Sequence, residues 1–426
     1  MDSVENFAIK PGLNLTYIPT GDKFKTLSVS INFHRPLCRE EASYNALLAD
    51  VMRRGCRKYP NQAALKKRQQ ELYGAYVDVD IRRKGEDQIL SFMLSVVSDE
   101  YLPAGESTEG AALDLLFNML LDPLTEQNAF RADYVEQEKV NLKNDIDAMI
   151  NDKRSYALWR LIELMCPNEP YGVHELGTKE EVDAISPQSL YAHYQKILRE
   201  GPVDVFVTGR TEIQKIAEIL RQRFADLALT KTSVPVAQLH CPAAKTEEVT
   251  EEFDVTQAKL CLGFSTGIAP TDADYPALML YNGILGSGAH SKLFNNVREK
   301  LSLAYYAASR LERYKGMMLI SSGIEIANKQ RALDEISVQM EDMRQGKISE
   351  YEFDAAMKSI VNALRSLGDD VGYLEDYYLG QTVSGTQMSL EDYIHQIMNV
   401  TADDVVRVAK RVQPEMVYFL TAKEGK

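Results

Sequence analysis

The side chains that most often bind metals are sparse in this sequence and far apart. The six histidines are His34, His174, His193, His240, His290 and His395. Since no two of them lie within five residues of each other, no helix presents the pair of histidines four residues apart that many zinc hydrolases use. The sequence therefore predicts no local metal motif, although a metal site assembled from separate loops stays open.

Other reactive groups give no familiar motif either. The five cysteines are Cys38, Cys56, Cys166, Cys241 and Cys261. Their odd number and the absence of a C-x-x-C pair argue against a disulfide framework and a cysteine-rich zinc site. Scattered thiols of this kind fit a reducing compartment. The sequence also lacks the G-x-S-x-G and G-x-x-x-x-G-K-[ST] motifs of serine hydrolases and phosphate-binding loops.

One glycine-rich segment resembles the start of a dinucleotide-binding motif. Gly286 and Gly288 flank a serine, but Ser291 stands where the third glycine is needed. That motif follows a strand, whereas residues 275–285 have the pattern of a helix. We expect a tight connection between two helices, with Ser291 capping the second. No cofactor is predicted.

The elements that would position any site alternate between strand and helix patterns along 426 residues. In the first half, period-two alternation predicts strands at 13–18, 27–33, 76–81, 88–97 and 203–208, and helical spacing predicts helices at 42–54, 62–72, 111–121, 126–165 and 211–224. In the second half we expect strands at 248–255, 258–265, 304–311 and 317–323, helices at 275–285, 291–301, 329–344 and 350–367, and a final helix and strand.

The second half repeats the first. Residues 185–190 and 400–405 share a pattern, as do the strands near the ends of the halves at 205–208 and 418–421. We predict an α+β fold of two homologous domains, each a mostly antiparallel sheet covered by helices on one face. The first domain spans 1–225, the aperiodic stretch 226–245 is a linker, and the second domain spans 246–426.

Charge and hydropathy exclude several classes of partner. The net charge is −14, from 48 basic and 62 acidic residues. An acidic surface repels phosphate backbones and anionic lipid, so neither nucleic acid nor a membrane is an expected partner. No stretch reaches the ~20 apolar residues that a bilayer span needs, and the N-terminus lacks a signal-peptide core. We predict a soluble, cytoplasmic protein.

The segment 285–305, LGSGAHSKLFNNVREKLSLAY, is similar to a signature of the pitrilysin/insulinase (M16-type) zinc metallopeptidases. Members typically read LGGGxxSRLFxxVREKxGLAY in their second homologous domain. Residues 54–60 resemble the family's KGTxxYP turn, and residues 170–178 its PYxxxxxGT motif. The resemblance covers the whole chain and implies that the two domains form half of a clamshell.

The same resemblance implies that the zinc motif is degenerate. The family's H-x-x-E-H, on a helix just before the Gly-Thr turn, aligns with a segment in which Ala46 and Asp50 replace the histidines and Ala49 replaces the glutamate. Glu138 matches a family glutamate-lysine pair, and Asp145 replaces the third ligand, a glutamate. A zinc hydrolase needs about three protein ligands and an activated water. We therefore expect no bound metal and no peptidase activity, and we interpret 46–49 as a core face of a helix.

Two family residues are kept. Arg298 and Tyr305 match the arginine and tyrosine with which family members bind substrate near the scissile bond. A guanidinium can grip a carbonyl or carboxylate, and a phenol can donate to a developing oxyanion. The alternative is a purely structural role, in which Arg298 pairs with a neighbouring acid and Tyr305 packs on the sheet.

The resemblance also suggests partners. Bacterial members of this length often pair a zinc-bearing chain with one that lacks the motif and supplies the arginine and tyrosine. Motifs near the N-terminus look like a non-catalytic subgroup of Gram-positive bacteria that is associated with 5-aminopentanol modification of elongation factor P. We thus expect a peptide substrate and a zinc-bearing M16-type partner chain in a heterodimer, or a homodimer. The alternatives are a scaffold or binding protein without a role in proteolysis, and an autonomous enzyme with an unrecognised metal site.

Overall fold

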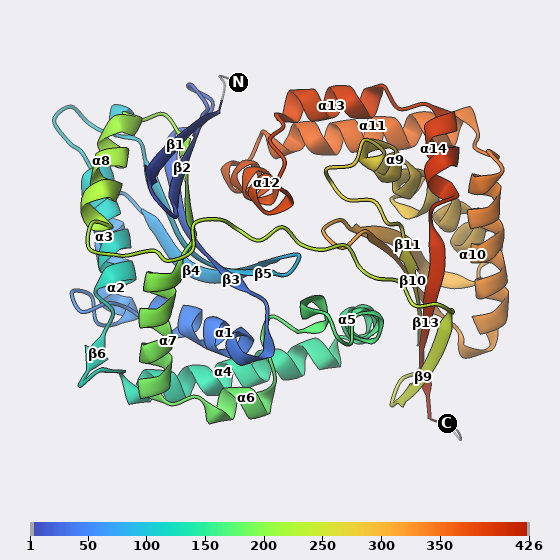
Figure 1. Ribbon diagram of the computed structural model, residues 1–426, viewed down its shortest axis with the longest axis horizontal. Helices are drawn as coiled ribbons and strands as arrows, with labels where there is room; N and C mark the ends of the chain where they lie inside the picture. The colour runs from blue at the N-terminus through green and yellow to red at the C-terminus, as the bar shows by residue number, and fades with distance from the viewer. Residues whose placement is uncertain (1–3, 424–426) are drawn as a thin grey trace. The chain divides into compact units, whose positions relative to one another are not determined.

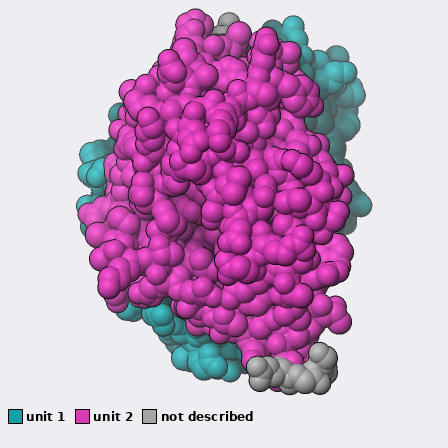
Figure 2. Space-filling view, turned by 90° about the vertical axis from the view of Figure 1, so that its right-hand side faces the viewer, with its two compact units in different colours: residues 1–147, 173–235, 371–380 teal, residues 148–172, 236–370, 381–426 magenta. Residues whose placement is uncertain are grey.

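The chain forms two compact units in a computed structural model that describes residues 4–423. Unit 1 contains residues 1–147, 173–235 and 371–380, and unit 2 contains residues 148–172, 236–370 and 381–426 (Figure 2). Each unit therefore includes a short segment from the other half of the chain. The domain limits at 225 and 246 stay a prediction about the sequence repeat.

Unit 1 is built on a six-stranded sheet in the order β1-β2-β8-β3-β5-β4 (Figure 1). Its strands are β1 (Glu5–Lys10), β2 (Leu13–Pro19), β3 (Thr26–Pro36), β4 (Tyr76–Lys84), β5 (Asp87–Val97) and β8 (Val203–Gly209). Neighbouring strands are antiparallel except β2 and β8, which run parallel. β2 and β3 follow each other along the chain, yet β8 lies between them.

The helices of unit 1 are α1 (Arg39–Arg53), α2 (Gln62–Glu71), α3 (Glu109–Leu121), α6 (Lys179–Ala184), α7 (Pro187–Glu200) and α8 (Ile213–Arg223). The prediction of one long helix over residues 126–165 is wrong in its extent. A small hairpin of β6 (Thr125–Glu126) and β7 (Ala129–Phe130) comes first, and α4 (Ala132–Asn151) and α5 (Lys153–Met165) are separate helices. Asp152 separates them because its carboxylate accepts a hydrogen bond from the Arg154 amide and caps α5.

Unit 2 has a five-stranded sheet in the order β11-β12-β10-β13-β9. Its strands are β9 (Glu247–Phe253), β10 (Ala258–Ser265), β11 (Ala304–Glu312), β12 (Met317–Ile324) and β13 (Gln413–Ala422). This order matches β4-β5-β3-β8-β2 of unit 1, and β9 and β13 are parallel as β2 and β8 are. The internal repeat predicted from the sequence is thus confirmed in the topology, together with the α+β class.

The helices of unit 2 include α5, α9 (Tyr275–Gly286), α10 (Lys329–Arg344), α11 (Glu350–Leu367), α13 (Leu390–Met398) and α14 (Ala402–Ala409). α12 (Val371–Ser384) begins in unit 1 and ends in unit 2. Three helices therefore stand before β13 where we expected one. The irregular segment 225–246 contains no helix or strand.

Both faces of the unit 2 sheet are covered, which goes beyond the prediction of helices on one face. Along β10, Leu260, Leu262 and Phe264 pack in the large core, whereas Cys261 packs in a second core with Leu161 and Met165 of α5. Figure 1 shows α5 on one side of this sheet and α9, α10 and α14 on the other. Burial on both sides explains why β12 is buried along its whole length. Within residues 4–423, no helix is long and apolar enough to cross a membrane.

Candidate functional site

The first set of predicted site residues lies on α1 in unit 1. Two of them, Ala46 and Ala49, are 3% and 1% exposed, and Leu47 and Leu48 between them are fully buried. This stretch therefore forms a core face of the helix, as we interpreted residues 46–49 from the sequence. A methyl side chain offers no ligand atom, so neither alanine can bind a metal.

Asp50 follows on the same helix and is only partly buried. Burial raises the pKa of its carboxyl to about 6, against the opposing charge of Arg53, whose Nη1 lies 3.3 Å from Asp50 Oδ1. The charges of Glu138 and Asp145 raise that pKa further, so α4 brings these acids near Asp50. The structure thus gathers acids that are up to 95 residues apart in sequence, from Asp50 to Asp145.

Arginines supply positive charge to this acidic cluster. Arg54 Nη1 lies 2.6 Å from Glu138 Oε1, and Arg53 Nε lies 2.9 Å from Asp78 Oδ1. Asn141 donates a further hydrogen bond to Glu138. Across residues 4–423, one group of three histidine, cysteine or acidic side chains has ligand atoms within 4.8 Å of one another, and it includes neither Asp50 nor Asp145. Asp50, Asp78 and Glu138 are therefore paired with guanidinium groups that belong to the chain itself.

The second set of predicted site residues lies in unit 2, where a π-helical segment, η3 (Leu293–Lys300), leads into β11. Arg298 is in the last turn of η3. The connection passes through Ser302, which has a φ of 49° and stands where the family pattern has glycine. Ser302 thus adopts a left-handed conformation, which glycine takes without the steric cost that serine carries.

Tyr305 is the second residue of β11 and sits at a β-bulge. Pairing with β12 passes from Ala304 opposite Ile324 directly to Tyr306 opposite Gly323, so Tyr305 is the extra residue. Bulges re-aim side chains and are frequent beside active sites. The Tyr305 ring is 54% exposed, so it does not serve as sheet packing.

Arg298 and Tyr305 line one pocket of about 360 Å³. The other lining residues are Glu299, Ser302, Leu303, Ala304 and Glu325. The Arg298 guanidinium lies 4.7 Å from the centre of the Phe294 ring, and its Nε lies 3.5 Å from Glu299 Oε1. Both members of that ion pair are largely exposed, so it holds the arginine only weakly.

This pocket can bind a carboxylate or a peptide carbonyl. A guanidinium stacked on an aromatic ring still has N–H groups in its plane that can donate to an acceptor. The phenol beside it can donate a second hydrogen bond. Its volume falls in the lower range of small-molecule pockets and suits a side chain or a short peptide segment. The structure brings the two predicted residues together, and their role in binding substrate stays a prediction.

Known proteins share both sequence and fold with this chain. Residues 184–360 match the family description "Peptidase M16 inactive domain". The probable inactive metalloprotease YmfF of Bacillus subtilis (strain 168) is 35% identical over 426 residues, covering all of both chains. The uncharacterized zinc protease YmxG of the same organism is 24% identical over 71% of this chain and 73% of its own. A crystal structure of a conserved protein from Enterococcus faecalis V583 has a TM-score of 0.93 at 31% identity and covers 99% of both chains.

Proposed function

We propose a function on the premise that the chain belongs to the M16 peptidase family, as a homologue of the inactive type. We propose that it is the non-catalytic subunit of a heterodimeric zinc metallopeptidase. In this role it positions a peptide substrate for a zinc-bearing partner chain. The observation that carries the proposal is the pairing of Arg298 with Tyr305 in one pocket of unit 2.

The residues of α1 support the non-catalytic half of the proposal. In the alignment with H-x-x-E-H, Ala46 and Asp50 stand at the histidine positions and Ala49 stands at the position of the general base. Hydrolysis at a zinc centre needs a ligand set that holds the metal and a base that takes a proton from water. Two buried methyl groups provide neither, and the nearby Arg53 disfavours a cation beside Asp50.

The pocket supports the binding half. Arg298 would hold a carbonyl or carboxylate of the peptide through two parallel hydrogen bonds, and the Tyr305 hydroxyl would donate to an oxygen that gains negative charge during attack. Neither group needs a metal in its own chain. The bulge at Tyr305 and the left-handed Ser302 fix both side chains on short, defined segments.

The first test is kinetic. The purified chain is mixed with the zinc-bearing relative from its own genome and a fluorogenic peptide. Loss of a charge-assisted hydrogen bond of about 1.5–3 kcal/mol predicts that Arg298→Ala lowers kcat/KM about 10- to 100-fold. Arg298→Lys should fall in between because lysine keeps the charge and loses the fork. Tyr305→Phe should lower kcat more than it raises KM if the hydroxyl acts on the developing oxyanion.

Matched controls come from α11, also in unit 2. Arg365 and Tyr351 are exposed and lie outside the pocket, so Arg365→Ala and Tyr351→Phe should leave kcat/KM unchanged. Equal activity of the wild-type and Arg298→Ala mixtures would remove the positioning role.

The alternative is a scaffold or binding protein without a role in proteolysis. It predicts a stable homodimer in size-exclusion chromatography and no affinity for a zinc-bearing relative. An autonomous peptidase, by contrast, would cleave the peptide with no partner present.

We also propose a link to the 5-aminopentanol modification of elongation factor P. The whole-length relatives from Bacillus subtilis and Enterococcus faecalis, both Gram-positive bacteria, support the placement in that subgroup. The test is the intact mass of elongation factor P from a deletion strain and from strains complemented with the wild type or Arg298→Ala. An unchanged mass in the deletion strain would contradict this link without touching the positioning role.

A further inference from the structure

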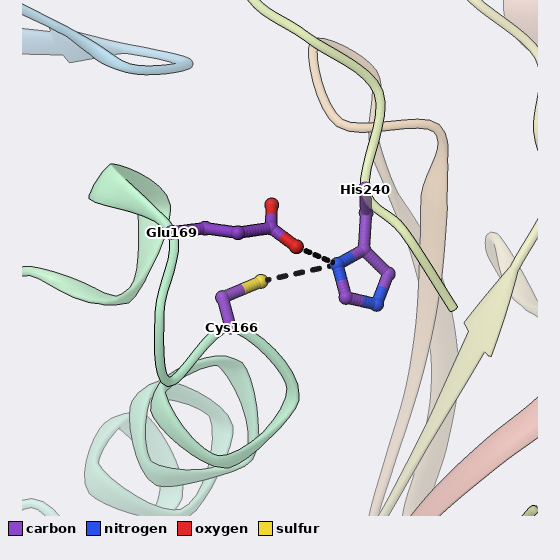
Figure 3. Close-up of side chains that lie close together, drawn as sticks. All are labelled: Cys166, Glu169 and His240. Carbon is purple, nitrogen blue, oxygen red and sulfur yellow. Dashed lines mark hydrogen bonds and ion pairs between the residues drawn. The ribbon is translucent and has the colours of Figure 1, made fainter. Parts of the chain in front are cut away.

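A cysteine, a glutamate and a histidine converge in unit 2 (Figure 3), and none of them lines the Arg298 pocket. Cys166 Sγ lies 3.6 Å from His240 Nδ1, and Glu169 Oε1 lies 2.5 Å from the same nitrogen. The three ligand atoms all lie within 4.8 Å of one another. Cys166 and His240 are buried, and Glu169 is partly exposed.

The backbone fixes this arrangement. Cys166 directly follows the last residue of α5, and its amide donates to Ile162 O at 2.9 Å. The Glu169 amide donates back to Cys166 O at 3.2 Å. The next turn brings Gly172 so close that a Cβ there would lie 2.2 Å from Cys166 O. Glycine is required at that position by close approach. The loop therefore presents Cys166 and Glu169 from a rigid turn.

His240 comes from the irregular segment that the sequence suggested as a linker. Its amide donates to Lys315 O at 2.9 Å, which anchors the segment beside β12. Its Nε2 lies 2.6 Å from Glu415 Oε1, and the Ala243 amide donates to the same oxygen at 3.1 Å. The ring is thus held by groups on both sides, with Nδ1 facing Cys166 and Glu169.

We propose that Cys166, Glu169 and His240 bind a zinc ion that fastens the segment around His240 to the end of α5. The ligand set is the sulfur, nitrogen and oxygen mixture that zinc accepts. Tetrahedral zinc with ordinary Zn–S and Zn–N bonds separates these two ligand atoms by about 3.6 Å, the spacing found between Cys166 and His240. The Nδ1–Oε1 separation must widen by about 0.8 Å to the ligand spacing in a zinc site, which the partly exposed Glu169 side chain permits.

The surroundings supply the outer contacts of a zinc site. Metal-bound histidines usually donate their other ring N–H to a carboxylate, as His240 Nε2 does to Glu415. Lys315 Nζ lies 2.7 Å from Glu169 Oε2, which leaves Oε1 for the metal. Water on the open side of Glu169 would complete the coordination. Most structural zinc sites are closed by four protein ligands; here the burial of Cys166 and His240, together with the anchoring of the His240 segment to the end of α5, is the ground for a structural role.

Charge balance answers the objection that Lys315 would repel a cation. Without metal, the imidazolium and the ammonium balance the two glutamates, and the thiol is neutral. Zinc binding releases one proton from Cys166 and one from His240 to solvent, so two positive charges enter and two leave. The buried cluster is neutral in both states, and no uncompensated charge is created.

Cobalt substitution tests the site in the full-length chain. Metal-free protein is dialysed against Co²⁺, and the near-ultraviolet thiolate-to-cobalt charge-transfer band is recorded together with the bound metal. We expect about one equivalent and a thiolate band. Cys166→Ser should abolish the band, and Glu415→Gln should weaken binding about 10- to 100-fold. Two controls should keep the band: Cys241→Ser, an exposed cysteine next to His240, and Cys261→Ser, a buried cysteine elsewhere in unit 2.

Absence of the band in wild-type protein, or its loss in Cys241→Ser with retention in Cys166→Ser, would overturn the proposal. X-ray absorption of the zinc-loaded wild type tests the ligand set without any variant, so it does not depend on whether the variants fold. One sulfur with nitrogen and oxygen ligands supports the site, and a shell of oxygen alone contradicts it. Neither readout depends on peptidase activity, so this proposal and the positioning role can fail separately.

Discussion

Gly263 on β10 offers a sharp test of how α5 packs on the sheet of unit 2. A Cβ added to Gly263 would lie 2.1 Å from Met165 Sδ and 2.9 Å from its Cε. Gly263→Ala therefore forces the methionine to move. Overpacking costs about 1–3 kcal/mol, and the lower end applies because the end of a methionine side chain is flexible. The smaller entropy of the unfolded alanine chain offsets about 0.4–1 kcal/mol of that cost, which leaves a net loss of roughly 0–0.6 kcal/mol.

A double-mutant cycle isolates this contact. Met165→Ala alone should cost about 2–5 kcal/mol because it opens a cavity in the second core of unit 2. In the double variant the new methyl group occupies space that the methionine left. We therefore expect the double variant to be more stable than the sum of the single effects by about 1–2 kcal/mol.

Urea unfolding followed by tryptophan fluorescence measures these free energies directly. The chain has one tryptophan, Trp159, which lies on α5 itself and reports on unit 2. As a control, Gly110→Ala on α3 places a methyl group where nothing lies within 4 Å and should be additive with Met165→Ala, as followed by circular dichroism. Additivity of Gly263→Ala and Met165→Ala within about 0.5 kcal/mol would refute the packing of α5 against β10.

Three further predictions concern charge and backbone strain. Burial alone would lower the pKa of His34, but the flanking Asp87 and Asp204 carboxylates raise it to about 10. The protonated His34 therefore stabilises the folded state fully below the unfolded pKa of about 6.5, and this stabilisation is lost as the pH rises through about 10. His34→Gln should thus cost about 3–5 kcal/mol near pH 7 and less at pH 10, as measured by hydrogen exchange of β3. Burial raises the pKa of Asp50 to about 6, so stability falls as the pH rises from about 4 to 6, and Asp50→Asn should raise the melting temperature at pH 7 but not at pH 4. Ser302→Gly should stabilise unit 2 by about 0.5–1 kcal/mol in urea unfolding by relieving the left-handed serine; a loss of stability would show that the serine is not strained.

Strand alternation predicted most of the two sheets. The strands at 27–33 and 258–265 lie inside their sheets and are buried at nearly every position, and apolar residues at every second position identified both in the sequence. The order of the strands was harder to obtain. β2 and β3 are consecutive, and so are β9 and β10, yet a strand near the end of each half inserts between them. Such long-range pairing leaves no local signal.

The largest errors came from segments whose neighbours are distant in sequence. The apolar pattern at 126–165 looked like one helix because both α4 and α5 are amphipathic, and only the cap at Asp152 separates them. The pattern could not reveal that the boundary between the two units falls within α4, after Asp147. The unbroken apolar run at 317–320, at the start of β12, was the sign in the sequence that both faces of this sheet are covered.

The candidate site was predicted by resemblance and is explained by the backbone. Arg298 and Tyr305 are seven positions apart, a spacing that shares one face only in a continuous helix, whereas here the chain leaves η3 and enters β11 between them. A π-helical turn, a left-handed serine and a bulge together bring both side chains to one pocket. The sequence analysis did not identify His240 as a site residue because it lies in an aperiodic segment. Such segments usually run over the surface, so a buried histidine is not expected there.

The central claim is that this chain positions a peptide but does not cleave it. The most direct measurement compares fluorogenic peptide hydrolysis by the chain alone, by the zinc-bearing relative alone and by their equimolar mixture. We predict turnover by the mixture well above the sum of the separate chains, with none from the chain alone. Hydrolysis by the isolated chain that a chelator abolishes, or a mixture no faster than the relative alone, would contradict the account.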